Sequence, residues 1–344
     1  MVWQLSRFAL TKQVPLTISR GTTAKVEHLL LEFSYGGCTG RGETGGFDTG
    51  QRCFDTPALE QELQQWLPSL GAEAPPPRQQ WRSLLAPLSP PARCAVDLAL
   101  HDWWGKQMGY PLWQLWGLGL DRLKPTSITL GLGSVEEMLQ RLNSWRCVLP
   151  ATRVKLKLGS PAGISHDQAL VEALVPHLAG AELQVDANGG WDLETAKFML
   201  PWLFDRGVVL VEQPLPARSG DEQDFAALHG LSPIAIVADE SCWGIEDMLR
   251  LAPYVQGVNL KLLKTGGLTE AFLMAQLAQH LNLNLMLGCY SDSSLLNGAA
   301  AQLLPLVEWP DLDSHLNLIN DPFLAPPRQG DLLRPSQLPG IGVP

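Results

Sequence analysis

Five short segments share one pattern: an apolar run, a charged residue at its end, and then a loop. In chain order the charged residues are Lys157, Asp186, Glu212, Asp239 and Lys261, two lysines with three acids between them. A charged side chain at the end of a buried strand costs free energy unless it binds something. One such residue could be a structural ion pair, but five on successive strands indicate a site that does chemistry.

The three acids come from successive predicted strands and have no His or Cys beside them. Hard oxygen ligands on a rigid frame suit Mg2+, with water or substrate in the remaining positions. The sequence therefore predicts a Mg2+ site on Asp186, Glu212 and Asp239. The alternative is that lysines neutralise the acids directly, which would require a lysine between the acids rather than on both flanks.

Lys157 precedes the acids and Lys261 follows them, so we expect the two lysines to face each other across the metal. A divalent cation and a like-charged neighbour both disfavour an ammonium, so the pKa of at least one lysine should fall toward neutrality. Mg2+ on a substrate carboxylate or amide oxygen would also make the adjacent α-proton more acidic. One lysine could then remove this proton and the other return it on the opposite face, a 1,1-proton transfer.

Strand alternation adds neighbours to this set, because residues two apart in a strand point to the same face. Lys155 therefore lies beside the first lysine, and Asn188 lies beside the first acid. Lys264 follows its strand in a glycine turn, and we expect it at the periphery. Arg20, in a polar loop near the N-terminus, could meet a substrate carboxylate or remain a solvated loop arginine.

Positioning these side chains requires a frame in which the ends of several strands meet. Short apolar or β-branched segments begin near residues 127, 153, 183, 208, 235, 257, 284 and 306. Helical periodicity lies between most of them, most clearly at residues 136–142, 167–178, 193–203 and 268–280. Eight such units predict an α/β protein with a parallel (β/α)8-type barrel, whose active site lies at the carboxyl ends of the strands. The alternative is a doubly wound open sheet, which the lack of a glycine-rich phosphate loop disfavours.

The flanking parts of the chain predict a second domain. Alternating or apolar runs at residues 3–10 and 25–33 indicate antiparallel strands. A helix follows, with one apolar face from Ala92 to Trp103. We therefore expect an α+β capping domain at residues 1–120 and the barrel at residues 121–320, with the proline-rich tail, residues 321–344, packing back on the capping domain.

Composition limits the partners and the compartment. The 344 residues carry a net charge of −10 and no basic run, which disfavours nucleic acid and anionic membranes as partners. The six cysteines lack zinc-binding spacing, so we expect free thiols in a reducing compartment. No secretory signal or membrane-length apolar run is visible, and we expect a cytoplasmic protein. We also expect a homo-oligomer that acts on a small-molecule substrate.

The strand-end motifs resemble those of the enolase superfamily, and within it the muconate-lactonising-enzyme-like subgroup. The matching motifs span the predicted barrel in order and are Lys155-Leu-Lys157, Asp186-Ala-Asn188, Glu212-Gln-Pro214, Asp239-Glu-Ser241 and Asn259-Leu-Lys261. The resemblance implies Mg2+ on the three acids, the flanking lysines as acid and base, and Lys155 in electrostatic support. It also implies a capping domain built from the N-terminal part and the returning tail.

A narrower resemblance is to dipeptide epimerases of the L-Ala-D/L-Glu type. It rests on residues 239–242, residues 258–268 and the pair Asp311-Leu-Asp313. In that group the paired acids bind the α-ammonium of the dipeptide, so the resemblance implies this role for Asp311 and Asp313. The alternative is that Asp311 caps a loop and Asp313 is solvated. Tyr290 stands where the group usually has Met, and Asp292 where it has Glu, so these two positions bear on the recognition of the substrate side chain.

Together these features predict a Mg2+-dependent epimerase or racemase of a small carboxylate substrate, with a dipeptide as the favoured substrate. The enzymatic alternatives are o-succinylbenzoate synthase and N-acylamino-acid racemase, since they use the same lysines and metal. A barrel that binds its ligand without turnover is the alternative outside catalysis. The intact Lys157 and Lys261 argue against it.

Overall fold

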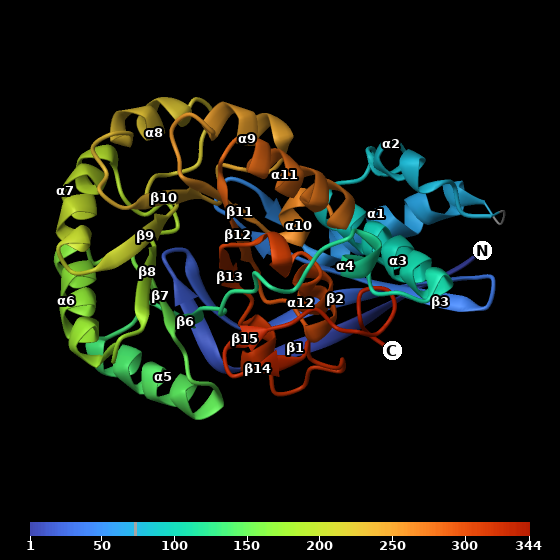
Figure 1. Cartoon of the computed structure of the whole chain (residues 1–344), viewed down its shortest axis with the longest axis horizontal. Helices are drawn as coiled ribbons and strands as arrows, with labels where there is room; N and C mark the ends of the chain where they lie inside the picture. Colours follow the sequence, from blue (N-terminus) through green and yellow to red (C-terminus); the bar gives the residue numbers. More distant parts are fainter. Residues whose placement is uncertain (72–73) are drawn as a thin grey trace.

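A parallel sheet of eight strands forms the centre of the computed structural model, which describes residues 1–71 and 74–344 (Figure 1). The strands lie in chain order and are β6 (Ile128–Leu130), β7 (Arg153–Lys157), β8 (Glu182–Asp186), β9 (Val208–Glu212), β10 (Ala235–Ala238), β11 (Gly257–Leu260), β12 (Asn284–Gly288) and β13 (Trp309–Asp311). The Ser127 N–H donates to the Pro310 carbonyl over 3.0 Å, which brings the two edges together into a nearly closed barrel. The predicted (β/α)8-type barrel is therefore confirmed.

Helices cover the outside of the barrel, and Figure 1 shows α5 to α9 as an arc around the strands. These helices are α5 (Val135–Val148), α6 (Ile164–Leu174), α7 (Leu193–Phe204), α8 (Glu222–Leu228), α9 (Ile245–Leu251), α10 (Leu262–Thr265), α11 (Leu268–His280) and α12 (Ser294–Ala301). Leu156 and Val185 of the strands share one buried apolar cluster with Leu142 of α5 and Leu170 of α6. Burial of this face is what holds the helices on the parallel sheet. Within the described ranges, no helix is long and apolar enough to cross a bilayer.

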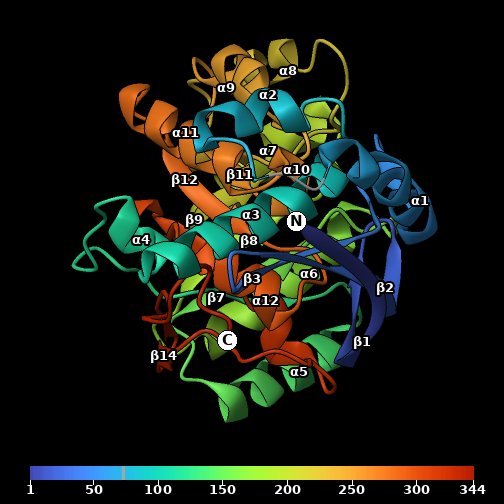
Figure 2. The ribbon, with the colours of Figure 1, turned by 90° about the vertical axis from the view of Figure 1, so that its right-hand side faces the viewer.

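The N-terminal part forms an antiparallel sheet of β1 (Val2–Ile18), β2 (Gly21–Tyr35) and β3 (Cys38–Gly45). The long helix α3 (Pro90–Met108) packs against it, and Figure 2 shows α3 beside β3. Glycine permits this close approach, because a Cβ at Gly42 would lie 1.9 Å from the Ala95 carbonyl oxygen. The smaller elements are β4 (Phe47–Asp48), β5 (Cys53–Phe54), α1 (Thr56–Trp66), α2 (Trp81–Leu85) and α4 (Leu112–Leu115).

The β1–β2 hairpin reaches from this sheet to the mouth of the barrel. Its end is anchored there because the Thr17 carbonyl accepts a hydrogen bond of 2.8 Å from the loop after β6. Regular pairing of β1 with β2 is interrupted between Thr11 and Leu16. Within this interruption the Asn317 side chain accepts from the Val14 N–H at 3.1 Å and donates to the Val14 carbonyl at 2.8 Å. The hairpin is therefore fixed to the end of the barrel that holds the strand-end charges.

The C-terminal tail returns to α3 after a short hairpin of β14 (Arg328–Gln329) and β15 (Leu332–Leu333). The Ile341 N–H donates to the Asp102 carboxylate at 3.0 Å, and the Leu112 N–H donates to the Gly340 carbonyl at 3.1 Å. These bonds tie the tail to the N-terminal part, while the domain limits at residues 120 and 320 stay predictions. Short 3-10 turns complete the fold at η1 (Leu67–Leu70), η2 (Arg78–Gln80), η3 (Val175–His177), η4 (Leu304–Leu306) and η5 (Ser314–Asn317).

Candidate active site

The strand-end charges converge at one mouth of the barrel. The register of β7, β8 and β9 places Lys157, Asp186 and Glu212 side by side. Asp239 follows β10 and Lys261 follows β11, at the carboxyl ends where barrel enzymes carry their active sites. The three acids are fully buried, and the two lysines are at most 8% exposed. The structure thus brings together all five residues that the sequence singled out.

One oxygen of each acid is fixed by a neighbouring donor. Asp186 Oδ1 accepts the main-chain N–H two residues further on, at 2.8 Å. Glu212 Oε1 accepts the Asn259 Nδ2 amide at 2.7 Å, and Asp239 Oδ1 accepts Lys264 Nζ at 2.6 Å. These bonds orient the three carboxylates toward the same space.

The other oxygen of each acid faces a lysine ammonium. The pairs are Lys157 Nζ with Asp186 Oδ2 at 2.5 Å, Lys261 Nζ with Asp239 Oδ2 at 2.6 Å, and Lys155 Nζ with Glu212 Oε2. Direct neutralisation requires a lysine between the acids, and Lys155 holds that place in the structure. In this structure the lysines therefore do neutralise the acids. Within the described ranges, no three His, Cys, Asp or Glu side chains are grouped as metal ligands.

The three lysine-facing oxygens nevertheless fit a divalent cation. They are hard carboxylate oxygens without His or Cys nearby, which is the donor type that Mg2+ takes. Burial and the Asp186 charge raise the pKa of Glu212 to about 8. Because burial and the neighbouring acids disfavour the ionised form of Glu212, a divalent cation at these oxygens would stabilise its carboxylate.

Neighbouring carboxylates favour the charged form of two of these lysines, Lys155 and Lys261. Burial alone would lower the pKa of Lys261, but the Asp239 charge outweighs it and raises the pKa well above its usual value. Burial likewise opposes the charge of Lys155, and Asp311 raises its pKa well above the usual value. Each of these two ammonium groups touches a carboxylate, which favours the charged form, and the lowered lysine pKa expected beside a bound metal ion stays a prediction.

Lys264 is the position where the sequence-based expectation is wrong. It is fully buried rather than peripheral, and it donates to Asp239 Oδ1 at 2.6 Å and to the Asn259 carbonyl at 2.8 Å. The one-turn helix α10 turns Lys264 back toward the strand end that holds Lys261. The signal that could have found it is the pair of leucines directly before it, since apolar residues indicate a buried turn rather than an exposed loop.

A cavity of about 50 Å3 opens beside the lysines. Its lining comes from the barrel and from the β1–β2 hairpin, and it includes Lys155, Lys157, Lys261, Asp311, Asp313, Lys12 and Leu16. Both acids of the Asp-Leu-Asp motif therefore face the space beside the two flanking lysines, as their spacing predicts.

Asp311 and Asp313 differ in what their oxygens hold. Asp311 accepts Ser127 Oγ at one oxygen and Lys155 Nζ at the other, each at 2.6 Å. Asp313 Oδ2 accepts the Thr129 N–H at 2.6 Å, and the Thr129 side chain also interacts with this carboxylate. Asp313 is only 7% exposed, which excludes the alternative that it is solvated. Because each carboxylate oxygen has two lone pairs, Asp313 can still accept a hydrogen bond from a ligand in the cavity that it lines.

Arg20 and Asn188 line a separate cavity of about 320 Å3. The Arg20 guanidinium donates to the Asn188 carbonyl at 3.1 Å and to the Glu240 carboxylate at 3.0 Å. Arg20 is therefore not a solvated loop arginine but a tie between the hairpin and the barrel. Substrate contacts of Arg20 and Asn188 stay predictions.

Tyr290 lines the cavity, and Asp292 lies behind it. The Lys261 Nζ sits 4.5 Å from the Tyr290 ring centroid, and the ring stacks on Phe47 with centroids 4.1 Å apart. Asp292 is 3% exposed and accepts the Tyr290 N–H at 3.2 Å. Burial and the nearby Glu43 raise the pKa of Asp292 to about 7. A direct contact of Asp292 with substrate stays a prediction.

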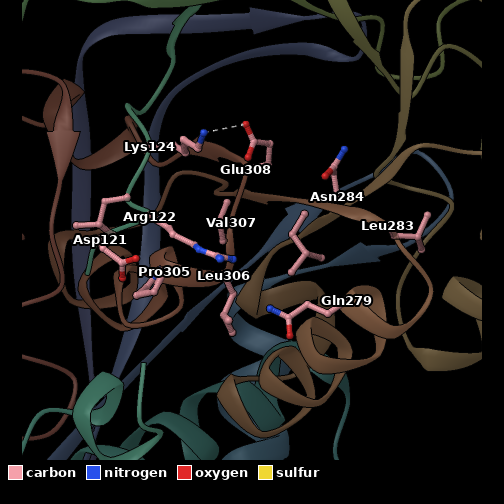
Figure 3. A pocket seen from close by; sticks show the side chains of 12 residues that line it. Asp121, Arg122, Lys124, Gln279, Leu283, Asn284, Pro305, Leu306, Val307 and Glu308 are labelled. Atoms are coloured by element: carbon pink, nitrogen blue, oxygen red, sulfur yellow. Dashed lines mark ion pairs between the residues drawn. The ribbon is translucent and has the colours of Figure 1, made fainter. Parts of the chain in front are cut away.

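A larger cavity of about 510 Å3 lies at the other end of the barrel (Figure 3). Asn284 at the start of β12 and Glu308 just before β13 line it, so it opens at the amino ends of the strands. Lys124 and Glu308 form an ion pair there at 3.4 Å. None of the five converging strand-end residues lines this cavity, so size alone does not mark the active site.

Two family models match the chain. The mandelate racemase / muconate lactonizing enzyme N-terminal domain matches residues 4–117, and the enolase C-terminal domain-like family matches residues 135–344. A hydrophobic dipeptide epimerase from Flavobacteria bacterium (strain MS024-2A) is 35% identical over 347 residues, covering 100% of this chain and 98% of that protein. Another from Roseobacter litoralis is 36% identical over 335 residues, covering 97% of this chain and 96% of that protein.

A solved structure agrees with these relatives. The dipeptide epimerase from Methylococcus capsulatus, complexed with Mg and the dipeptide L-Arg-D-Lys, has a TM-score of 0.88 and 27% identity. The match covers 99% of this chain and 98% of that chain. The relatives are epimerases, so the chain is placed among the isomerases. Fold, strand-end motifs and family matches agree: the chain belongs to the mandelate racemase / muconate lactonizing enzyme family of the enolase superfamily.

Proposed function

We propose that this protein is a Mg2+-dependent dipeptide epimerase that moves the α-proton between Lys157 and Lys261. The observation that carries the proposal is a single cavity lined by both lysines, each of which contacts one of the buried carboxylates. The names of the relatives support dipeptides as the substrate class, and the Methylococcus structure holds both Mg and a dipeptide.

The two lysines come from strands that lie across the barrel from each other, β7 and β11. Mg2+, held by the lysine-facing oxygens of Asp186, Glu212 and Asp239, would supply the positive charge that makes the substrate α-proton more acidic. One lysine accepts that proton with its Nζ lone pair. The other, as an ammonium, donates a proton to the opposite face of the same carbon.

Lys155 and Asp313 position the substrate for this transfer. Lys155 Nζ lies among the acids and stabilises the negative charge that develops on the substrate carboxylate. The Asp313 carboxylate, which lines the cavity, accepts a hydrogen bond from the α-ammonium of a dipeptide. Asp311 also orients Lys155 through one of its oxygens, and a contact of Asp311 with the α-ammonium stays a prediction.

The Asp313 oxygen also separates the dipeptide from the enzymatic alternatives. N-acylated amino acids and the precursor of o-succinylbenzoate have no α-ammonium. They would leave this buried carboxylate unpaired near the negative charge of the substrate, which costs free energy. A barrel that only binds its ligand has no need for lysines on both sides of one cavity.

Deuterium exchange tests the proposal directly. Dipeptides with a free N-terminus are incubated with the protein and Mg2+ in D2O, and mass spectrometry reports deuterium at the α-carbon. We expect exchange at the C-terminal residue, its loss after EDTA treatment, and its return when Mg2+ is added back. N-acetylated dipeptides should exchange much more slowly. Exchange that survives EDTA, or that proceeds equally with N-acetylated dipeptides, would contradict the proposal.

A further inference from the structure

Lys12 is a buried cation that the proposed proton transfer does not use. It is 7% exposed and lines the cavity together with Asp313. Across residues 1–71 and 74–344, the Lys12 Nζ makes no hydrogen bond and no ion pair within 4.0 Å. Burial accordingly lowers the pKa of Lys12. A buried ammonium without a direct partner is costly unless a ligand supplies one.

The backbone of β1 explains why Lys12 reaches the cavity. Regular pairing with β2 stops after Thr11 and resumes at Leu16, and Lys12 bridges Leu318 near the barrel mouth instead. An interruption of this kind bends a strand and re-aims its side chains. The Asn317 side chain bonds the main chain two residues after Lys12, which fixes the bend against the barrel.

Arg141 adds a second positive charge to the same place. It comes from α5, lines the same cavity, and has its guanidinium 4.3 Å from the Trp145 ring centroid. It also has no carboxylate within 4.0 Å in the part of the chain that the structure describes. The acid whose charge acts on both cations is Asp313. Asp292 also acts on Lys12, but within the described residues neither Lys12 nor Arg141 has a carboxylate within 4.0 Å.

We propose that Lys12 and Arg141 form a subsite for an anionic side chain on the N-terminal residue of the substrate. This inference rests on the proposed epimerase function. With the α-ammonium on Asp313, the side chain of that residue leaves its α-carbon close to the two cations. An N-terminal Asp or Glu presents both charges that this end of the cavity complements, whereas Lys or Arg would meet two like charges. The preference differs from the hydrophobic dipeptides in the names of the relatives.

A pair of nearly isosteric substrates isolates the charge. Dipeptides with L-Glu or L-Gln at the N-terminus share one C-terminal residue, chosen as the fastest in the D2O panel. The ratio of their kcat/KM values for α-deuterium exchange then reports the charge alone. We expect the Glu dipeptide to be favoured about ten-fold or more, since about 1.4 kcal/mol from a charge-assisted contact gives a factor of ten.

Two variants locate the effect. Lys12→Met keeps the apolar stem and removes the charge, so it should bring the Glu/Gln ratio close to one, and Arg141→Met should reduce the ratio. Lys25→Met is the matched control, because Lys25 is exposed on β2 and pairs with Thr11 in register. It removes the same charge from the same sheet and should keep the wild-type ratio. Thermal unfolding of each variant separates lost folding from lost selectivity.

The outcomes distinguish the subsite from the enzyme itself. Equal kcat/KM for the Glu and Gln dipeptides in the wild-type protein would overturn the subsite and leave the epimerase proposal intact. No exchange with any dipeptide would instead overturn the epimerase proposal. A ratio that falls as far in Lys25→Met as in Lys12→Met would show an effect of net charge and would overturn the subsite.

Discussion

At the residue scale, the site depends on which oxygen of each buried acid is already fixed. Asn259 holds one oxygen of Glu212, and Lys264 holds one oxygen of Asp239. Donors behind a carboxylate orient its remaining oxygen, which in this fold faces a cation. A buried carboxylate is stable only with such partners. The contacts that stabilise the folded barrel therefore also orient the candidate metal ligands.

The lysine pair gives the first prediction. Lys157→Ala and Lys261→Ala should each abolish epimerisation, because each removes the base for one stereoisomer and the acid for the other. Each variant should still exchange the α-proton of one stereoisomer, and the two variants should prefer opposite stereoisomers. Mass spectrometry of deuterium uptake from L,L- and L,D-dipeptides measures this preference. The same preference in both variants would show that the lysines do not lie on opposite faces of the substrate.

The raised pKa of Asp292 leads to a prediction of how the free energy of unfolding depends on pH. Burial and Glu43 raise its pKa to about 7 in the folded protein, from the usual value of 3.8. Between these two values the folded state keeps a proton that the unfolded chain has released. The contribution of this group to the free energy of unfolding therefore falls as pH rises through that window.

Asp292→Asn cannot ionise, so its free energy of unfolding should depend less on pH across this window than that of the wild type. Urea unfolding at several pH values within the window measures the difference. Asp48→Asn serves as the control, because Asp48 is exposed. Parallel pH curves for the wild type and Asp292→Asn would contradict the prediction.

At the element scale, the close packing of α3 on β3 requires a residue without a side chain at Gly42. A Cβ at Gly42 would lie 1.9 Å from the Ala95 carbonyl oxygen, so Gly42→Ala must push the helix from the sheet. We expect a loss of about 1–3 kcal/mol in the free energy of unfolding. Gly244→Ala is the control, since its Cβ would meet no heavy atom within 4 Å and its φ is −154°. Equal stabilities of the two variants in denaturant would refute this account.

Elements were predictable where charge and apolar pattern coincide. Apart from β13, each barrel strand begins within one residue of its expected position, because a short apolar or β-branched run marks a buried strand. The strand β13 begins at Trp309 because Leu304–Leu306 forms a 3-10 turn. In the sequence, an apolar run of that length looks the same whether it forms a turn or a strand. The helix α10 is a single turn, too short to show a period, which is why Lys264 was misplaced.

Contacts between distant segments could not be predicted in the same way. The bond from Lys155 to Asp311 joins residues 156 positions apart, and strand pattern alone does not give that pairing. The direction of Lys12 depends on an interruption in the register of β1, which alternation along the strand does not encode. The sequence therefore indicated the acids and the flanking lysines but gave no sign of the cations near Asp313.

At the scale of the whole molecule, the cavity exists where two parts of the chain meet. Lys12 and Leu16 come from the hairpin, while the three lysines of the site come from the barrel strands. Arg20 joins the two parts through the Asn188 carbonyl and the Glu240 carboxylate. Anything that loosens the N-terminal part from the barrel should therefore remove one wall of the substrate cavity.

The tail is a further tie between these parts, and Ile341 tests it. The Ile341 side chain is fully buried, and its N–H donates to Asp102 of α3 at 3.0 Å. Asp102 also accepts the Arg41 main-chain N–H at 2.8 Å, so one carboxylate joins the tail, α3 and β3. Ile341→Ala would leave a cavity at this junction, and we expect it to lower the free energy of unfolding by about 2–5 kcal/mol.

Leu338→Ala is the matched control, because Leu338 lies in the same tail but is 41% exposed, and its truncation should change stability by only about 0.5 kcal/mol. Urea unfolding measures both variants, and α-deuterium exchange of a dipeptide follows activity in the same samples. If the tail holds the N-terminal part on the barrel, Ile341→Ala should lose α-deuterium exchange at a lower urea concentration than Leu338→Ala. The reason is that the β1–β2 hairpin, which forms one wall of the cavity, belongs to the N-terminal part and would separate from the barrel with it. Equal stability and activity in the two variants would show that the returning tail does not hold the substrate cavity together.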